Sequence, residues 1–174
     1  MSTNVRFLNP FVEAATEVLQ AEVGISVGRG NLTLQKSGLT TDDVTVLINL
    51  VGEIEGVVLY GMSFATGINL VSGMLGQPFE EFDNLAQSGV AELGNVISGK
   101  ATMKLSDAGI VSTISTPTLI IGNSVQISTL DFSRIVVPLT TDMGVIVVHL
   151  AVRETPEGQR GGGFVPLIRG INSK

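Results

Sequence analysis

The sequence predicts an α+β protein, in which a mostly antiparallel β-sheet carries long α-helices packed across one face. Two long segments place apolar side chains at helical spacing, one near the N-terminus and one at 85–106. Between and after them, short β-rich runs are separated by Gly, Asn and Asp. The order is helix, strands, two helices, strands. Such grouping of strands, without regular strand–helix alternation, favours the α+β class.

The first helix is expected to have Asn9 as its N-cap and Pro10 in the first helical position, and to end before Gly24. Pro suits this position because its missing N–H would have no partner there. The apolar side of this helix is made of Leu8, Phe11, Ala15 and Val18. The opposite side is polar, with Glu13, Thr16, Glu17 and Gln20.

The following segments are mainly strands. In chain order the residues predict a weak strand (25–36), a turn (38–43), two strong strands (44–51 and 56–63) with a hairpin loop between them (52–55), and a short helix (65–75). Gly28 and Gly30 are expected to bend the weak strand. The short helix ends at Gly76, with Pro78 beyond it.

After the helix at 85–106 the chain returns to strands. The expected β segments are 110–115, 119–121, 125–137 and 145–152. Pro117 lacks an N–H and limits hydrogen bonding along its strand. We therefore expect one domain over 1–153, followed by a Gly- and Pro-containing tail over 154–174. That tail is either mobile or docked on a neighbouring subunit or a sheet edge.

The helix at 85–106 has two distinct sides. Its apolar stripe is Ala86, Val90, Leu93, Ile97 and Ala101. Ser88, Glu92 and Asn95 lie within an arc of about 60°, almost opposite that stripe. Such a polar side can be an ordinary solvated face. Asn95 and Gly99 are poor helix formers on this side, however, and they indicate that a partner approaches closely there.

The string at 94–100, GNVISGK, resembles the first seven positions of a phosphate-binding loop. The eighth position is Ala101, so the hydroxyl that would hold Mg²⁺ is missing. That loop should also follow a buried strand, whereas these residues continue a helical period. We therefore do not expect nucleotide binding here.

Composition excludes several classes of function. The net charge is −6, and nucleic-acid binding requires clustered Lys and Arg. The chain has no Cys and only one His, His149, so a Ser-His triad or a thiolate metal site lacks its residues. No apolar run approaches the length of a membrane span, and the N-terminus has no signal-like segment. We expect a cytoplasmic protein without a membrane partner or a metal site of its own.

The pattern Ser88-x-x-x-Glu92-x-x-Asn95, followed after 21 residues by Pro117, resembles the signature of the CheC/CheX/FliY phosphatases of bacterial chemotaxis. The strings at 52–60 (GEIEGVVLY) and 74–76 (MLG) resemble neighbouring elements of CheX. The resemblance covers roughly 5–153 and implies a CheC-like fold. One copy of the motif is typical of CheX, which also implies a homodimer. In the first helix, Thr16 stands where a second site would need Asn, so we expect no second site.

The resemblance implies that the substrate is a phosphorylated CheY-type response regulator. Asn95 would orient the water that attacks the aspartyl phosphate, and Glu92 would pair with a Lys of the regulator. Ser88 would hydrogen-bond at the rim or support Glu92, Gly99 would allow close approach of the partner, and Pro117 would shape the neighbouring strand. The Mg²⁺ would belong to the regulator, with no cofactor bound by this chain.

An alternative of a different class is a docking module that binds a response regulator or a flagellar switch component without catalysis. Retained binding without turnover would favour it. The intact Glu92-x-x-Asn95 pair favours catalysis. The sequence does not indicate which regulator is the substrate, or whether the pathway is motility.

Overall fold

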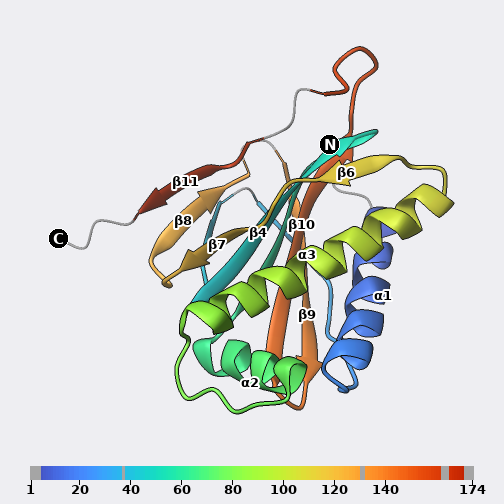
Figure 1. Ribbon diagram of the computed structural model, residues 1–174. Helices are drawn as coiled ribbons and strands as arrows, with labels where there is room; N and C mark the ends of the chain where they lie inside the picture. The colour runs from blue at the N-terminus through green and yellow to red at the C-terminus, as the bar shows by residue number, and fades with distance from the viewer. Residues whose placement is uncertain (1–4, 37, 130–131, 162–164, 171–174) are drawn as a thin grey trace.

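The computed structural model describes residues 5–36, 38–129, 132–161 and 165–170. It is an α+β fold in which three helices cover one face of an antiparallel sheet (Figure 1). The helices are α1 (Val5–Glu22), α2 (Phe64–Leu75) and α3 (Asn84–Asp107). Within the described ranges, no helix has the length and apolarity needed to cross a membrane.

Eight strands form the main sheet. They are β1 (Gly28–Arg29), β2 (Thr33–Gln35), β4 (Val44–Gly52), β5 (Ile54–Met62), β6 (Ser112–Ile114), β7 (Thr118–Ile121), β9 (Arg134–Thr141) and β10 (Gly144–Glu154). Their order is β1-β9-β10-β5-β4-β6, with β2 also pairing β9 and β7 also pairing β4. Every pairing is antiparallel. The predicted fold class is confirmed.

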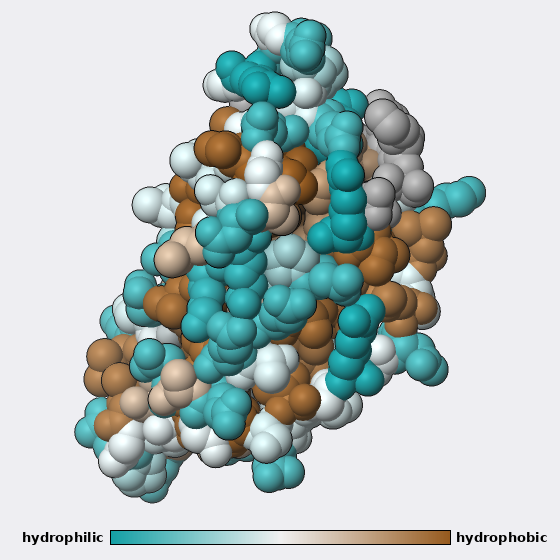
Figure 2. Space-filling view, turned by 90° about the vertical axis from the view of Figure 1, so that its right-hand side faces the viewer, coloured by the Kyte–Doolittle hydropathy of each residue, from teal (hydrophilic) through white to brown (hydrophobic). Residues whose placement is uncertain are grey.

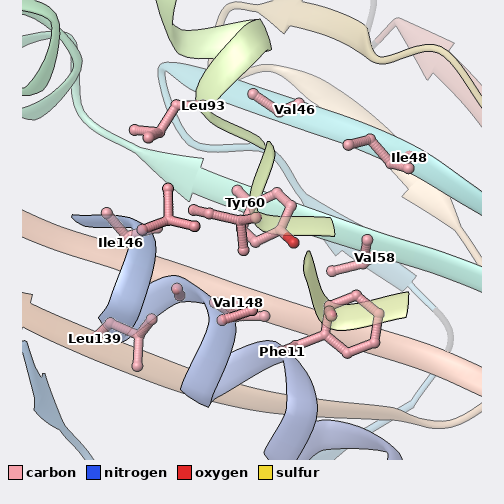
Figure 3. Close-up of a cluster of buried hydrophobic side chains, with 14 of the residues drawn as sticks. Phe11, Val46, Ile48, Val58, Tyr60, Leu93, Leu139, Ile146 and Val148 are labelled. Atoms are coloured by element: carbon pink, nitrogen blue, oxygen red, sulfur yellow. The ribbon is translucent and has the colours of Figure 1, made fainter. Parts of the chain in front are cut away.

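The principal core lies between the helices and the sheet. Because strand side chains alternate in direction, every second residue of β4, β5, β9 and β10 faces the helices. Val46, Val58 and Val148 are examples, and each is fully buried. Figure 3 shows this cluster, with Tyr60 of β5 lying among Val46, Val58 and Leu93. This core fixes which side of each helix faces outward.

The other face of the main sheet is partly covered by a second, three-stranded sheet. Its strands are β3 (Gly38–Thr40), β8 (Val125–Ser128) and β11 (Leu167–Gly170), in the order β11-β8-β3. Ile127 of β8 and Phe132 pack against Leu47, Val57 and Leu59 of the main sheet. The predicted turn at 38–43 is therefore wrong in its first half. The predicted segment 125–137 is divided between the two sheets.

The predicted start of the first helix is also wrong. Helix α1 begins at Val5, and Pro10 lies inside it. Phe7 and Leu8 are buried, so packing of this extra turn outweighs the hydrogen bond that Pro10 cannot make. The predicted end is confirmed, since the helix stops at Glu22 and Gly24 has a φ of 76°.

The part of the tail that the structure describes contains a strand. β11 pairs antiparallel with β8, from Leu167 opposite Ser128 to Gly170 opposite Val125. All four residues of β11 are exposed, and Figure 1 shows the strand at the outer edge of the small sheet. Residues 162–164 and 171–174 of the predicted tail lie outside the described residues.

Candidate functional site

Helix α3 carries the candidate site, and local sequence explains its start. Asp83 is the N-cap, and its side chain accepts a hydrogen bond of 2.8 Å from the Ala86 backbone N–H. The helix then runs without interruption to Asp107, so the string at 94–100 forms no phosphate-binding loop. The whole predicted apolar stripe is buried: Ala86, Val90, Leu93, Ile97 and Ala101.

The three glycines of α3 have different surroundings. A Cβ added at Gly89 would lie 3.1 Å from Val71 of α2, and one added at Gly94 would lie 2.8 Å from Val46 of β4. These two glycines allow close packing inside the protein. Gly99 differs, because a Cβ there would meet nothing within 4 Å. Gly99 is thus the glycine of α3 that leaves room for something outside the chain.

The predicted polar stripe lies on the outward side of α3. Ser88 and Glu92 are exposed, and Asn95 is half-buried. The described part of the chain offers no hydrogen bond or ion pair to any of these three side chains. An α-helix rises about 1.5 Å per residue, so Glu92 and Asn95 are about 4.5 Å apart along the axis. The stripe presents a hydroxyl, a carboxylate and a carboxamide that are free to meet a partner.

In α1, a second site would use Asn9, Glu13 and Thr16. All three side chains are engaged in contacts within the chain. The Thr16 hydroxyl donates to the Val12 carbonyl at 2.9 Å, and Glu13 lies 3.6 Å from Lys104. The side-chain oxygen of Asn9 accepts a 3.5 Å hydrogen bond from Arg29. These contacts agree with a structural role for α1.

Ion pairs link α1 to the C-terminal half of α3. Glu17 contacts Lys100 and Lys104, each at 2.8 Å. Hydrogen bonds from these two lysines lower the pKa of Glu17 to about 2. Figure 2 views the molecule from the side on which α1 lies, and hydrophilic atoms predominate down its middle. The lysines of α3 therefore lie away from the polar stripe and are already paired.

Three exposed apolar side chains beside the polar stripe were not predicted from the sequence. Leu85, Val96 and Met103 are 52%, 38% and 68% exposed, respectively. At 100° per residue they form a row within about 100° of Asn95 on the outward side of α3. They could have been identified from the sequence, because they are apolar residues that lie outside the buried stripe. They add hydrophobic area to a helix face that otherwise presents polar groups.

Pro117 lies where the strand beside α3 is interrupted. β6 and β7 both pair with β4, and α3 packs against all three strands. Between the pairs Leu47–Thr118 and Leu50–Ile114, β4 has two residues and its partner has three, 115–117. This is a β-bulge, which bends the strand. Pro117 lies outside the ladder, as predicted, since no ladder pairing with β4 is formed over 115–117.

Among the described residues, no group of three or more His, Asp or Glu could hold a metal ion. His149 lies on β10, and burial together with the nearby charge of Arg134 lowers its pKa to about 4. His149 is therefore neutral at physiological pH, and its Nδ1 atom is buried without a hydrogen-bond partner.

Comparison with known proteins gives one consistent family. Residues 44–140 match the model of the chemotaxis phosphatase CheX. The chain is 30% identical to the CheY-P phosphatase CheX of Thermotoga maritima over 125 residues, which are 71% of this chain and 81% of that protein.

Solved structures agree in fold. A chemotaxis protein CheX from Desulfovibrio desulfuricans is 27% identical, with a TM-score of 0.76 over 86% of this chain and 99% of that one. CheX in a CheX–CheY–BeF₃–Mg²⁺ complex from Borrelia burgdorferi is 25% identical, with a TM-score of 0.72 over 85% of this chain and 98% of that one. The chain belongs to the CheX family of chemotaxis phosphatases.

Proposed function

We propose that this protein hydrolyses the aspartyl phosphate of a CheY-type response regulator, using Asn95 and Glu92 of α3. The observation that carries the proposal is the outward stripe of Ser88, Glu92 and Asn95, which has no partner among the described residues. Membership of the CheX family supports the reaction class, and the Thermotoga relative is a CheY-P phosphatase. The Borrelia relative forms a complex with CheY, which supports the class of partner.

The reaction needs few residues from the phosphatase. A water oxygen bonds to phosphorus while the bond from phosphorus to the aspartyl oxygen breaks, which leaves inorganic phosphate and a free carboxylate. One water proton stays on the phosphate and the other is released. Phosphoryl transfer depends mainly on positioning and charge stabilisation. The Mg²⁺ would be bound by the regulator, and the solved complex of CheX with CheY from Borrelia contains Mg²⁺, which supports this assignment.

Asn95 is suited to hold the attacking water. Its carboxamide oxygen accepts a hydrogen bond from the water, while its NH₂ group can donate to a phosphoryl oxygen. A carboxylate in this position would repel the negative phosphoryl group. Glu92, one turn back, pairs with a Lys of the regulator and sets the register of docking. Ser88, on the same stripe, would hydrogen-bond with the regulator at the rim of the contact or support Glu92.

Docking is completed by the remainder of the outward side of α3. Val96 and Met103 are exposed apolar side chains that the regulator would bury. Gly99 has open space around it, which lets the partner backbone approach next to Asn95. We also propose that the protein acts as a homodimer, which light scattering after size-exclusion chromatography would test.

The test is the loss of phosphate from labelled CheY-type regulators with the wild type, Asn95→Ala and Ser106→Ala. Ser106 is exposed on the same side of α3, about 16 Å further along the axis, and serves as the matched control. We expect acceleration by the wild type and Ser106→Ala, and at least about 100-fold less by Asn95→Ala. Regulator binding without acceleration by the wild type would instead establish the docking module. Absence of both binding and acceleration would refute both functions.

A further inference from the structure

Asn95 can position a water only if α3 holds a fixed height and rotation above the sheet. The apolar stripe of α3 decides which side of the helix faces the sheet, but it leaves the height and the fine rotation open, because hydrophobic contact is non-directional. Two of its five residues, Ala86 and Ala101, are also small. A directional contact close to Asn95 is therefore needed to fix the position of the helix.

Gly94 sets the height of the helix. It directly precedes Asn95, and a Cβ there would lie 2.8 Å from Val46 Cγ1 and 3.4 Å from Tyr60 Cδ2. The helix backbone therefore rests directly on the side chains of β4 and β5. No side chain of α3 separates the helix from the sheet at this residue.

A buried hydrogen bond sets the rotation. Ser98 is 0% exposed, and its hydroxyl lies 2.8 Å from the hydroxyl of Tyr60, which is 2% exposed. Burial raises the pKa of Tyr60 above its ordinary range, so both partners are neutral hydroxyls. Ser98 lies one turn after Asn95, and Tyr60 points from the sheet into the core among Val46 and Leu93 (Figure 3). Directional hydrogen bonds fix geometry in a way that apolar contacts do not.

We propose that Tyr60, Ser98 and Gly94 are positioning residues for the phosphatase reaction: they hold the turn of α3 that carries Asn95 against β4 and β5. This inference rests on the proposed function. The regulator would not touch any of the three, because Tyr60 and Ser98 are buried and Gly94 faces Val46. They act through Asn95, so their loss should affect turnover more than docking.

The test uses Tyr60→Phe, Ser98→Ala and the double variant, each in the full chain. Each single variant leaves one buried hydroxyl without its partner, which lowers stability, whereas the double variant removes both hydroxyls. We measure Tm, the Kd for a beryllofluoride-activated regulator, and kcat on the phosphorylated regulator that the wild type dephosphorylates fastest. Thr41→Val is the control, because Thr41 is 4% exposed and its hydroxyl donates a part-buried hydrogen bond to the Gly122 carbonyl, outside α3.

We expect the double variant to recover most of the Tm lost by the single variants and to bind the regulator within twofold of wild type. Its kcat should nevertheless stay about 10-fold below wild type, because the directional contact is still missing. Thr41→Val should lower Tm without lowering kcat. Recovery of kcat together with Tm would show that the pair is merely structural and would overturn the inference. A wild type without any turnover would refute the proposed function first, and the positioning role with it.

Discussion

The substitution Gly99→Ala adds one methyl group, and it should raise the stability of the fold while it weakens binding of the regulator. The structure leaves open space there, so Gly99→Ala meets no steric penalty within the chain. Replacing a mid-helix Gly by Ala stabilises a protein by about 0.5–1 kcal/mol. For a chain of this size, such a gain raises Tm by roughly 1–4 °C. If the regulator approaches Gly99 as proposed, the same methyl group should weaken its binding by about 10-fold through overpacking.

Gly94→Ala provides the matched contrast within the same helix. Its added Cβ would lie 2.8 Å from Val46, so either α3 or Val46 must shift, and Tm should fall. Thermal unfolding and titration with a beryllofluoride-activated regulator would measure both variants. A Gly99→Ala protein that is more stable and binds as tightly as wild type would refute close approach of the partner at Gly99.

Three further outcomes are expected. Glu92→Lys should raise the Kd for the activated regulator more than it slows turnover of the bound complex, as titration and single-turnover kinetics would show; an unchanged Kd would contradict the pairing of Glu92 with a regulator Lys. His149 should make the fold acid-sensitive, because its pKa of about 4 in the folded state lies below the value of about 6.5 expected on unfolding. Stability should therefore fall by up to about 3 kcal/mol as pH decreases from about 6.5 to 4, and urea titrations of His149→Gln should lack that loss. Deletion of 165–174 should leave turnover within twofold of wild type, since among the described strands β11 pairs with β8 alone and its four residues are exposed; a larger loss in the phosphate-release assay would assign the tail a functional role.

The features that the sequence predicted well are those expressed by local periodicity. Helix α3 has 24 residues, enough turns for its buried and outward sides to be distinguished, and both sides were assigned correctly. The hairpin of β4 and β5 was also predicted, because both strands are strongly apolar and lie next to each other in the chain. The outward placement of Ser88, Glu92 and Asn95 was predicted for the same reason.

The missed features depend on contacts between distant residues. The small sheet joins 38–40, 125–128 and 167–170. The pattern of apolar residues within a strand does not indicate which distant strand pairs with it. Helix α1 begins before Pro10 because buried Phe7 packs on the core, a tertiary effect that local propensity does not contain. The hydrogen bond between Tyr60 and Ser98 likewise joins residues 38 positions apart.

The proposed mechanism places Asn95 at the reacting water, and one comparison tests this most directly. Single-turnover loss of phosphate from a CheY-type regulator should be measured at saturating wild type and at saturating Asn95→Ala. The side chain of Asn95 has no partner among the described residues, so the substitution should leave Tm at or slightly above the wild-type value. We expect normal binding of the regulator with a rate close to that of the regulator alone. A rate equal to wild type at full binding would show that Asn95 does not position the water.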